Sequence, residues 1–491
     1  MFRLKKIGEV KPVVSRDIID SKIGLGFEKL DRDVFDPEKA YSHVAASGVK
    51  WIRIQSGWAR TEKTKGVYDF AWLDAVVENL LACGCRPWIC LCYGNGIYDE
   101  DAAKVFGGVG CVPNKTEEQK AAWSRYVTTL VARYAGKVQH FEIWNEPDGG
   151  WCWKKFKGDE VWFDCENAGR EYGEFVIATT AAIRKGNPDA KPIAGSMCGN
   201  SLRWLTDVAR TGCFKDVWGF TYHCYSADET DNPERVRMLR AFLGKYNPDI
   251  KIIQGESGSQ SRPDGKGALR GLAWTEEKQA KQLLRHTVSD LLCGVEFMSF
   301  FSCMDMIEAL NGRVGDKASY MDFGYFGVLA AEFDENGRAT GTVRPKLSYR
   351  ALQNIAAIFR ELPEEYSVPA FIWSETSELM GWTRLSASAQ EITFGGFRRP
   401  DGSKIFVYWK PTDLINCSVT ETVSPVLAEC PGIPRLIDPM SGFIYEIPET
   451  MCEKKTDGCW KFKALPLFDY PLFLMWGDFL LEGKMRVKEN D

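Results

Sequence analysis

The sequence predicts an α/β protein built on a (β/α)8 barrel of the TIM type, followed by an antiparallel β-sandwich. Three observations predict it. Eight short apolar segments are each followed by a helical pattern, these segments are apolar almost throughout, and beyond residue 362 the pattern changes to short β-type segments. Strands that are apolar on both faces are typical of a parallel barrel, which helices cover outside and side chains fill inside.

The barrel is expected over residues 21–362, and its strands follow one another with a helix after each. The predicted strands are residues 23–27, 50–55, 87–92, 138–143, 191–194, 217–223, 250–254 and 295–301.

Several of the intervening helices carry start and stop signals. Asp36-Pro37-Glu38 supplies an N-cap and an N1 proline for a helix that ends near Gly48. Thr116 and Gln119 have the spacing of a capping box. A long helix is expected over residues 275–292, before Gly294.

A second domain is expected over residues 363–491, together with residues 1–20. Its β-type segments are residues 391–397, 404–410, 434–447 and 461–476, separated by turn residues such as those at 399–402. Residues 1–15 are expected to add a strand to this sandwich.

Composition narrows the class of partner. The 491 residues are 45% apolar and 26% charged, with a net charge of −5, which argues against binding to nucleic acid or an anionic membrane. No apolar run has the length of a bilayer span, and the first residues lack a signal-peptide core. We therefore expect a cytoplasmic protein whose 16 cysteines are reduced thiols.

Metal binding is not expected. Cys83/Cys85 and Cys90/Cys92 have CxC spacing, whereas structural zinc sites use CxxC-type spacing, and the histidines do not cluster. No cofactor is expected either, and the oligomeric state is left open.

Polar residues follow several predicted strands at the end where barrel enzymes place their active sites. Strand four runs into Asn145 and Glu146, and strand seven runs into Glu256. The others are Arg53 at the end of strand two, and His223 and Tyr225 at and after the end of strand six. All are expected to face one cavity.

Two carboxylates at one barrel mouth suit cleavage of a glycosidic bond, in which one carboxyl protonates the leaving oxygen and the other attacks the anomeric carbon. Arg53 would favour the ionised form of its neighbour, and a partly buried carboxyl beside Trp144 and Trp151 would retain its proton more easily.

At these residues the chain resembles the retaining glycoside hydrolases of clan A, over the whole barrel. Trp144-Asn145-Glu146-Pro147 matches the Asn-Glu signature of the clan, which implies Glu146 as acid/base and Asn145 as a ligand of the substrate's 2-hydroxyl. The resemblance also implies Glu256 as nucleophile. His223-Cys224-Tyr225 matches the clan's His-x-Tyr, and Arg53 matches the arginine that holds the nucleophile charged.

Within the clan the chain is most similar to family 39, the β-xylosidase and α-iduronidase group, through Asp148, the residue 53–58 stretch and the accessory sandwich. It departs from many clan members in having Tyr93-Gly94-Asn95 after strand three, where they have a histidine. It also has Phe300-Phe301-Ser302 at strand eight, where they have a tryptophan.

The expected activity is therefore retaining hydrolysis of a β-glycoside, such as a β-xyloside, β-galactoside or β-glucoside, with no partner other than the carbohydrate. Trp58 and Trp151 lie on loops at the mouth, where they would either stack on sugar or pack in the loop. Long insertions at 94–115 and 303–345 favour an exo-acting pocket for short oligosaccharides. The alternatives are a non-catalytic carbohydrate-binding protein, an endo-acting glycanase of the same clan, a transglycosylase and a metal-dependent hydrolase.

Overall fold

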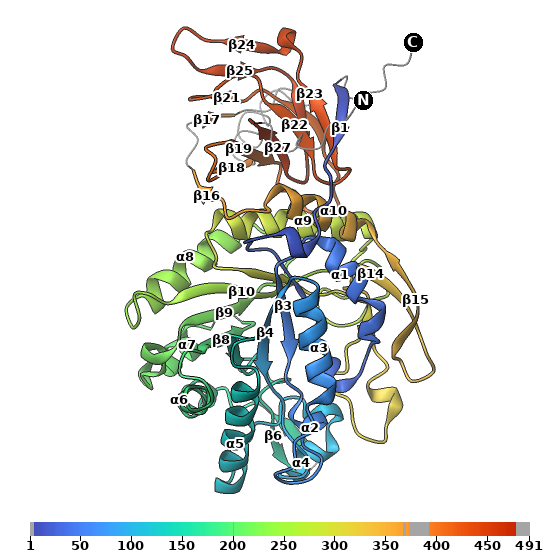
Figure 1. The fold of residues 1–491 in the computed structure, drawn as a ribbon, viewed down its shortest axis with the longest axis vertical. Helices are drawn as coiled ribbons and strands as arrows, with labels where there is room; N and C mark the ends of the chain where they lie inside the picture. Colours follow the sequence, from blue (N-terminus) through green and yellow to red (C-terminus); the bar gives the residue numbers. More distant parts are fainter. Residues whose placement is uncertain (1–3, 159, 200, 367–369, 373–391, 478–491) are drawn as a thin grey trace.

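A computed structural model describes residues 4–158, 160–199, 201–366, 370–372 and 392–477. Its fold is the predicted one: a closed parallel barrel with helices outside, and an antiparallel β domain that stands on one side of it (Figure 1). Within the expected second domain, residues 1–3, 367–369, 373–391 and 478–491 lie outside the described residues.

The eight barrel strands pair in chain order, each parallel to the next, and the last closes on the first. They are β2 (Gly24–Gly26), β3 (Trp51–Gln55), β4 (Arg86–Leu91), β5 (His140–Ile143), β8 (Lys191–Met197), β9 (Gly219–His223), β10 (Lys251–Ser257) and β11 (Met298–Phe300).

A longer helix follows each barrel strand and covers the outside of the barrel. These helices are α1 (Tyr41–Ser47), α3 (Ala71–Ala82), α5 (Glu117–Arg133), α6 (Ala168–Gly186), α7 (Leu202–Arg210), α8 (Asn232–Leu243), α9 (Glu276–Leu292) and α10 (Leu347–Ile358). Shorter elements in the loops include α2 (Trp58–Thr61), α4 (Glu100–Lys104) and the hairpins β6–β7 (Lys155–Lys157, Glu160–Trp162) and β14–β15 (Leu329–Phe333, Ala339–Pro345).

The helix signals of the sequence are confirmed at their termini. The Thr116 side chain accepts a hydrogen bond from the Gln119 backbone N–H at the start of α5. Asp36 caps a short 3₁₀ turn before α1, and Gly48 ends α1 with a φ of +78°. A left-handed C′ residue of this kind is the usual place for glycine, because glycine adopts positive φ without strain.

The interior of the barrel changes from aromatic to charged along its axis. At the amino ends of the strands Trp51, Trp88 and Phe297 form a buried cluster, in which the Trp51 and Phe297 rings stack with centroids 4.0 Å apart. Arg53 and Glu142 lie in the next layer, both with fully buried side chains. The aromatic layer excludes water from below, so the charged layer interacts through a low-dielectric medium.

The second domain is a sandwich whose sheets enclose their own apolar core. Its seven-stranded sheet has the order β1 (Lys5–Glu9), β23 (Phe443–Glu446), β22 (Arg435–Asp438), β27 (Leu472–Met475), β19 (Lys404–Trp409), β18 (Thr393–Arg398) and β16 (Glu364–Glu365). Facing it are two smaller sheets: β17 (Ala370–Phe371), β21 (Val426–Leu427), β25 (Trp460–Phe462) and β24 (Cys452–Lys454), and β20 (Thr420–Val423) with β26 (Leu465–Phe468).

Strand β19 of the seven-stranded sheet is buried on both faces. In β19, Phe406 and Tyr408 belong to the sandwich core, while Ile405, Val407 and Trp409 belong to the core that is continuous with the barrel. Successive residues of a strand point to opposite faces, so one strand serves two cores. Helices α9 and α10 lie between barrel and sandwich (Figure 1), and residues Gln279–Leu291 of α9 are accordingly all buried.

A buried ion pair ties the two domains together. Glu229, in the loop after β9, accepts hydrogen bonds from Arg285 Nε of α9 at 2.5 Å and from Trp409 Nε1 of the sandwich at 2.7 Å. Arg285 also donates to the Thr412 carbonyl at 2.8 Å. The carboxylate therefore neutralises a buried guanidinium at the joint.

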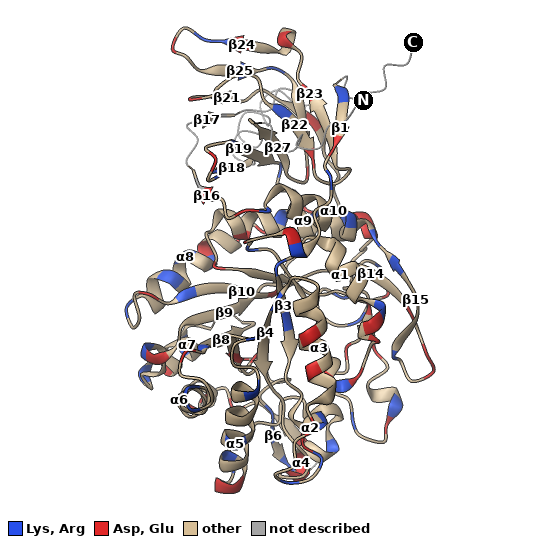
Figure 2. Ribbon diagram, viewed as in Figure 1, with Lys and Arg blue, Asp and Glu red and all other residues tan. Residues whose placement is uncertain are grey.

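Charge on the outside of the molecule is mixed. Figure 2 shows acidic and basic residues interspersed along the outer helices of the barrel, in keeping with the small net charge. Within the described ranges, no helix is both long enough and apolar enough to cross a lipid bilayer.

Replacing Glu229 with alanine is expected to lower the free energy of unfolding by about 3 to 5 kcal/mol, because Arg285 would stay buried without its counter-charge. Chemical denaturation measures this change. Glu234→Ala is the matched control, since Glu234 pairs with Arg237 in an exposed salt bridge whose loss should change stability far less. Equal losses of unfolding free energy in the two variants would contradict the stabilising role of the Glu229–Arg285 ion pair.

Candidate active site

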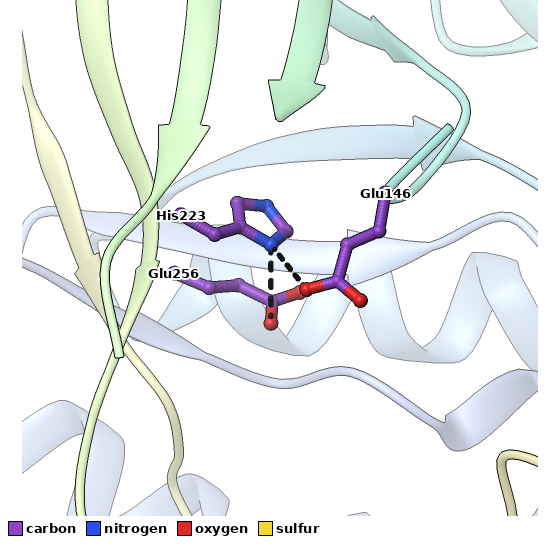
Figure 3. A group of neighbouring side chains, drawn as sticks. All are labelled: Glu146, His223 and Glu256. Carbon is purple, nitrogen blue, oxygen red and sulfur yellow. Dashed lines mark hydrogen bonds and ion pairs between the residues drawn. The ribbon is translucent and has the colours of Figure 1, made fainter. Parts of the chain in front are cut away.

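Glu146, His223 and Glu256 form a compact cluster at the carboxyl ends of three barrel strands (Figure 3). His223 Nδ1 lies 2.9 Å from Glu146 Oε1 and 3.6 Å from Glu256 Oε2. An oxygen of each carboxylate and a ring nitrogen of the histidine all lie within 4.8 Å of one another. The structure thus brings together both predicted carboxylates and the predicted histidine.

Glu146 is held on a strained turn at the end of β5. Trp144 and Glu146 have φ angles of +71° and +47°, a region that costs non-glycine residues about 1 to 3 kcal/mol each. The turn is fixed by the fully buried Trp144 indole, which donates to the Cys152 carbonyl at 2.7 Å. This packing turns Asn145 and Glu146 into the barrel mouth.

The carboxylate of Glu146 receives two contacts. Trp151 Nε1 donates to Glu146 Oε2, and His223 Nδ1 bonds to Oε1. On the far side of the imidazole, Ser196 Oγ lies 3.0 Å from His223 Nε2. The histidine therefore orients Glu146 while being held itself.

Glu256 is held by two donors. Arg53 Nη1 and Glu256 Oε1 form an ion pair, and the Tyr225 hydroxyl donates to Oε2 at 2.8 Å. Burial opposes ionisation of Glu256, but His223, Arg53 and Tyr225 outweigh it and hold the pKa of this carboxyl below its usual value. The surroundings of Glu256 thus favour its ionised form.

The pKa of His223 shifts in the opposite direction to that of Glu256. Burial disfavours its charged form, yet the negative charge of Glu256 and the hydrogen bond to Glu146 raise the pKa of His223. The two carboxyl groups that it links therefore favour the protonated form of the imidazole.

Arg53 has a contact at every nitrogen of its guanidinium. Nε donates to Glu142 at 2.7 Å, Nη2 donates to Asn145 Oδ1 at 2.8 Å, and Nη1 faces Glu256. One buried cation therefore aligns the second carboxylate and the amide that precedes Glu146.

Several of these residues line a cavity of about 500 Å³. Asn145, Glu146, Trp151, Tyr225 and Glu256, all predicted from the sequence, line it. The remaining lining residues are Glu28, Lys29, Arg32, Gln55, Tyr93, Cys198, Gly267, Ala268, Arg270, Phe301, Glu308, Leu310, Asn311 and Phe326.

Arg53 and His223 do not line this cavity but lie against the carboxylates that do. Trp58, for which the sequence left open stacking on sugar or packing, is corrected as a substrate contact and takes the packing role. It is 1% exposed, stacks on Tyr98 and Tyr126, and donates to Glu62 at 2.5 Å. An indole has the same flat apolar face for a sugar as for a ring of the core, and here it packs in the core.

Several residues that line the cavity were not predicted from the sequence, and many of them lie in three segments. Glu28 and Lys29 follow β2, Arg270 and its neighbours come from the loop after β10, and Glu308 comes from the segment after β11. Of the two insertions expected to wall the site, only 303–345 reaches the cavity among the described residues, through Glu308, Leu310, Asn311 and Phe326. A charged residue directly after the first barrel strand was the available signal for Glu28.

The cluster of Glu146, His223 and Glu256 is the group among the described residues with the side chains and spacing to hold a metal ion. The positive charge of Arg53 lies against Glu256, however, where it would repel a cation. The geometry fits two carboxyl groups that His223 links better than it fits a metal site.

Comparison with known proteins supports the resemblance at two levels. The model of glycoside hydrolase family 42, described as beta-galactosidase, matches residues 27–97. A beta-xylosidase of Geobacillus stearothermophilus is 25% identical over 150 residues, which is 29% of this chain and only 27% of the relative.

Solved structures share the fold over nearly the whole chain. A family 39 glycoside hydrolase from Bacteroides cellulosilyticus has a TM-score of 0.61 and 17% identity, with 94% of this chain and 81% of that chain covered. The family 39 enzyme of Xanthomonas axonopodis has a TM-score of 0.56 and 16% identity over 95% of both chains. A monomeric beta-xylosidase of Caulobacter crescentus has a TM-score of 0.55 and 15% identity, covering 95% and 97%. The chain therefore shares its fold with family 39 glycoside hydrolases over nearly its whole length, as the resemblance implies.

Glu28 provides a test of the charge balance in the site. Burial, followed by the charge of Glu256, raises the pKa of Glu28 from 4.5 to about 8. The folded state thus keeps a proton that the unfolded state releases above pH 4.5, so this group lowers stability as the pH rises from 4.5 to 8. Glu28→Gln should gain stability relative to the wild type between pH 5 and pH 8, by on the order of 3 kcal/mol.

Denaturation curves of both proteins at several pH values measure that difference. Asp290→Asn is the comparison, because it removes the charge of a second buried carboxyl without adding side-chain volume. The Asp290 carboxyl is also buried, with a pKa raised to about 7, and it bonds to Tyr222 and Asn232 away from the cavity. A stability difference between wild type and Glu28→Gln that does not change with pH would contradict the predicted protonation of Glu28.

Proposed function

We propose that this protein is a retaining glycoside hydrolase that cleaves β-glycosides by double displacement. The observation that carries the proposal is the pair of cavity-lining carboxylates, Glu146 and Glu256, with oxygens within 4.8 Å of each other. Retaining glycosidases have carboxyl groups about 5 to 5.5 Å apart, whereas inverting enzymes leave room for a water between them.

Glu256 is the nucleophile in this proposal. Its ionised carboxylate attacks the anomeric carbon, and Arg53 and Tyr225 keep the attacking group charged and oriented. Tyr225 donates to Oε2 and Arg53 contacts Oε1, so the carboxylate cannot rotate freely away from the cavity.

Glu146 is the acid/base. It protonates the departing oxygen in the first step and removes a proton from the attacking water in the second. Its bonds to His223 and Trp151 fix its direction towards the leaving-group side. Asn145, positioned by Arg53, is the ligand of the sugar's 2-hydroxyl that the clan resemblance implies.

An exo action on short glycosides is proposed from the shape of the site. Loops after β10 and β11 contribute Arg270 and Asn311, and Trp151 from the loop after β5 also lines the cavity, which holds about 500 Å³. A site of this size is in the range that encloses a small ligand. The β-xylosidase relative and the β-galactosidase family match favour a β-linked xylose or galactose as the sugar.

Azide rescue assigns the two glutamates. With 2,4-dinitrophenyl β-xyloside, β-galactoside and β-glucoside as probes, Glu256→Ala should be inactive and azide should restore turnover with the α-glycosyl azide as product. Glu146→Ala should lose about 10² to 10⁴ in kcat on glycosides with poor leaving groups, and azide should yield the β-glycosyl azide. NMR of the products distinguishes the two anomers.

Glu62→Gln is the matched control for these variants. Glu62 is buried and bonds to Trp58 and Tyr98, but it does not line the cavity, so its variant should keep wild-type turnover. A wild-type protein that binds these sugars and cleaves none of the probes would instead support a non-catalytic carbohydrate-binding protein.

Action at chain ends is a separate prediction. β-Linked xylo-, galacto- and gluco-oligosaccharides should release single sugars from one end, because loops from several strands surround the cavity. Chromatography of early products measures this. Early appearance of internal fragments would identify an endo-acting glycanase of the same clan.

A further inference from the structure

A third carboxyl lies on the cavity floor beside the proposed nucleophile. Glu28 follows β2, is 1% exposed, and its Oε1 lies 3.4 Å from Arg53 Nη1. The same Nη1 contacts Oε1 of Glu256. Two carboxyl groups therefore contact the same terminal nitrogen of one guanidinium.

The backbone of β2 makes room for this arrangement. Gly26 is the register partner of Arg53 in the barrel sheet, and a Cβ at Gly26 would lie 2.2 Å from Glu28 Oε2. Any larger residue at position 26 would displace the carboxyl. Among the described residues Glu28 Oε2 has no hydrogen-bond partner.

The single positive charge of Arg53 cannot balance three ionised carboxyl groups around it. Glu142 already bonds to Nε at 2.7 Å, so Glu28 and Glu256 compete for what remains at Nη1. Like charges at one buried donor disfavour each other, and one of the two carboxyls keeps its proton. Burial, and next to it the charge of Glu256, raises the pKa of Glu28. His223 and Arg53 lower the pKa of Glu256. Below about pH 8 the free protein thus favours an ionised Glu256 and a protonated Glu28.

We propose that Glu28 is a positioning residue that exchanges charge with Glu256, releasing its proton while Glu256 is esterified and taking one up when the ester is hydrolysed. The inference rests on the proposed double displacement. Its physical basis is that attack converts Glu256 from an anion to a neutral ester, which removes the repulsion that keeps Glu28 protonated. Arg53 Nη1 then gains a new anionic partner in place of the lost one.

The steps balance as follows. In glycosylation, Glu256 supplies the electron pair of the new bond to the anomeric carbon, the bond to the leaving oxygen breaks, and Glu146 protonates that oxygen. The proton of Glu28 passes to water in the cavity. In hydrolysis, water attacks the anomeric carbon and gives its proton to Glu146, the ester bond returns its electron pair to Glu256, and Glu28 takes a proton from water.

Other groups contribute to the electrostatics of Glu28. The groups that face or adjoin it are Arg53 on β3, Glu256 on β10, Tyr225 after β9, Cys303 after β11 and the neighbouring Lys29. His223 and Glu146 also respond to loss of the charge on Glu256, so a test needs a difference between proteins that share both residues.

Proton release on trapping tests the exchange. Each protein is mixed with an excess of 2,4-dinitrophenyl 2-deoxy-2-fluoro-β-xyloside, -β-galactoside or -β-glucoside in weakly buffered solution between pH 6 and pH 9. Released dinitrophenolate counts the trapped sites, and an indicator dye counts protons. Wild type should release more protons per trapped site than Glu28→Gln, and a fall of one unit in pKa would give an excess of about half a proton at most.

Asp290→Asn is the matched control, since it removes a buried titrating carboxyl outside the cavity and should release as many protons as wild type. Gly26→Ala displaces Glu28 without removing it and should reduce the release, which provides a second route if Glu28→Gln is poorly folded. Trapping with equal proton release by wild type and the variants at every pH would overturn the exchange. Absence of trapping and of turnover in wild type would instead overturn the proposed glycosidase.

Discussion

The site depends on a single buried guanidinium. Arg53 lies above the aromatic layer of the barrel and contacts Glu142, Asn145, Glu256 and Glu28. Buried charges are stable only when paired and hydrogen-bonded, so each of these contacts holds the arginine as much as the arginine holds them. Three strands and the residue after a fourth are thereby aligned on one cation. Arg53 thereby positions the cavity-lining carboxylate of Glu256 and favours its ionised state.

The same constraint explains why strain is tolerated at the end of β5. The left-handed backbone at Trp144 and Glu146 is unfavourable by itself, but the turn is fixed at both ends. The indole of Trp144 is locked in the core, and the Asn145 side chain accepts from Arg53. Packing and a charged hydrogen bond together over-determine the turn, and the strained geometry aims Glu146 across the mouth at Glu256. Stability is spent here on orientation, as is common at functional sites.

The sequence was sufficient for the fold and for the residues that end strands. Closure of eight parallel strands brings their carboxyl ends together, so Glu146, His223, Tyr225 and Glu256 had to converge once the strands were identified. The sequence could not decide the role of Trp58, because an indole after a strand can pack in the core or stack on a sugar equally well. Arg270 and Glu308 were missed because they lie on loops whose path depends on tertiary packing; for instance, Glu308 fits only because Gly267 and Gly324 leave room for its carboxyl.

Glu28 lies between these cases. Its place after the first strand was legible, but its role depends on a detail that periodicity does not carry, namely that Gly26 leaves space beside Arg53. With that space filled, the Glu28 carboxyl would be displaced from its place beside Arg53. With it open, the protein keeps a protonated carboxyl that destabilises the folded state as the pH rises. A barrel fold alone does not require such a group, and the proposed charge exchange with Glu256 would give it a role in the reaction.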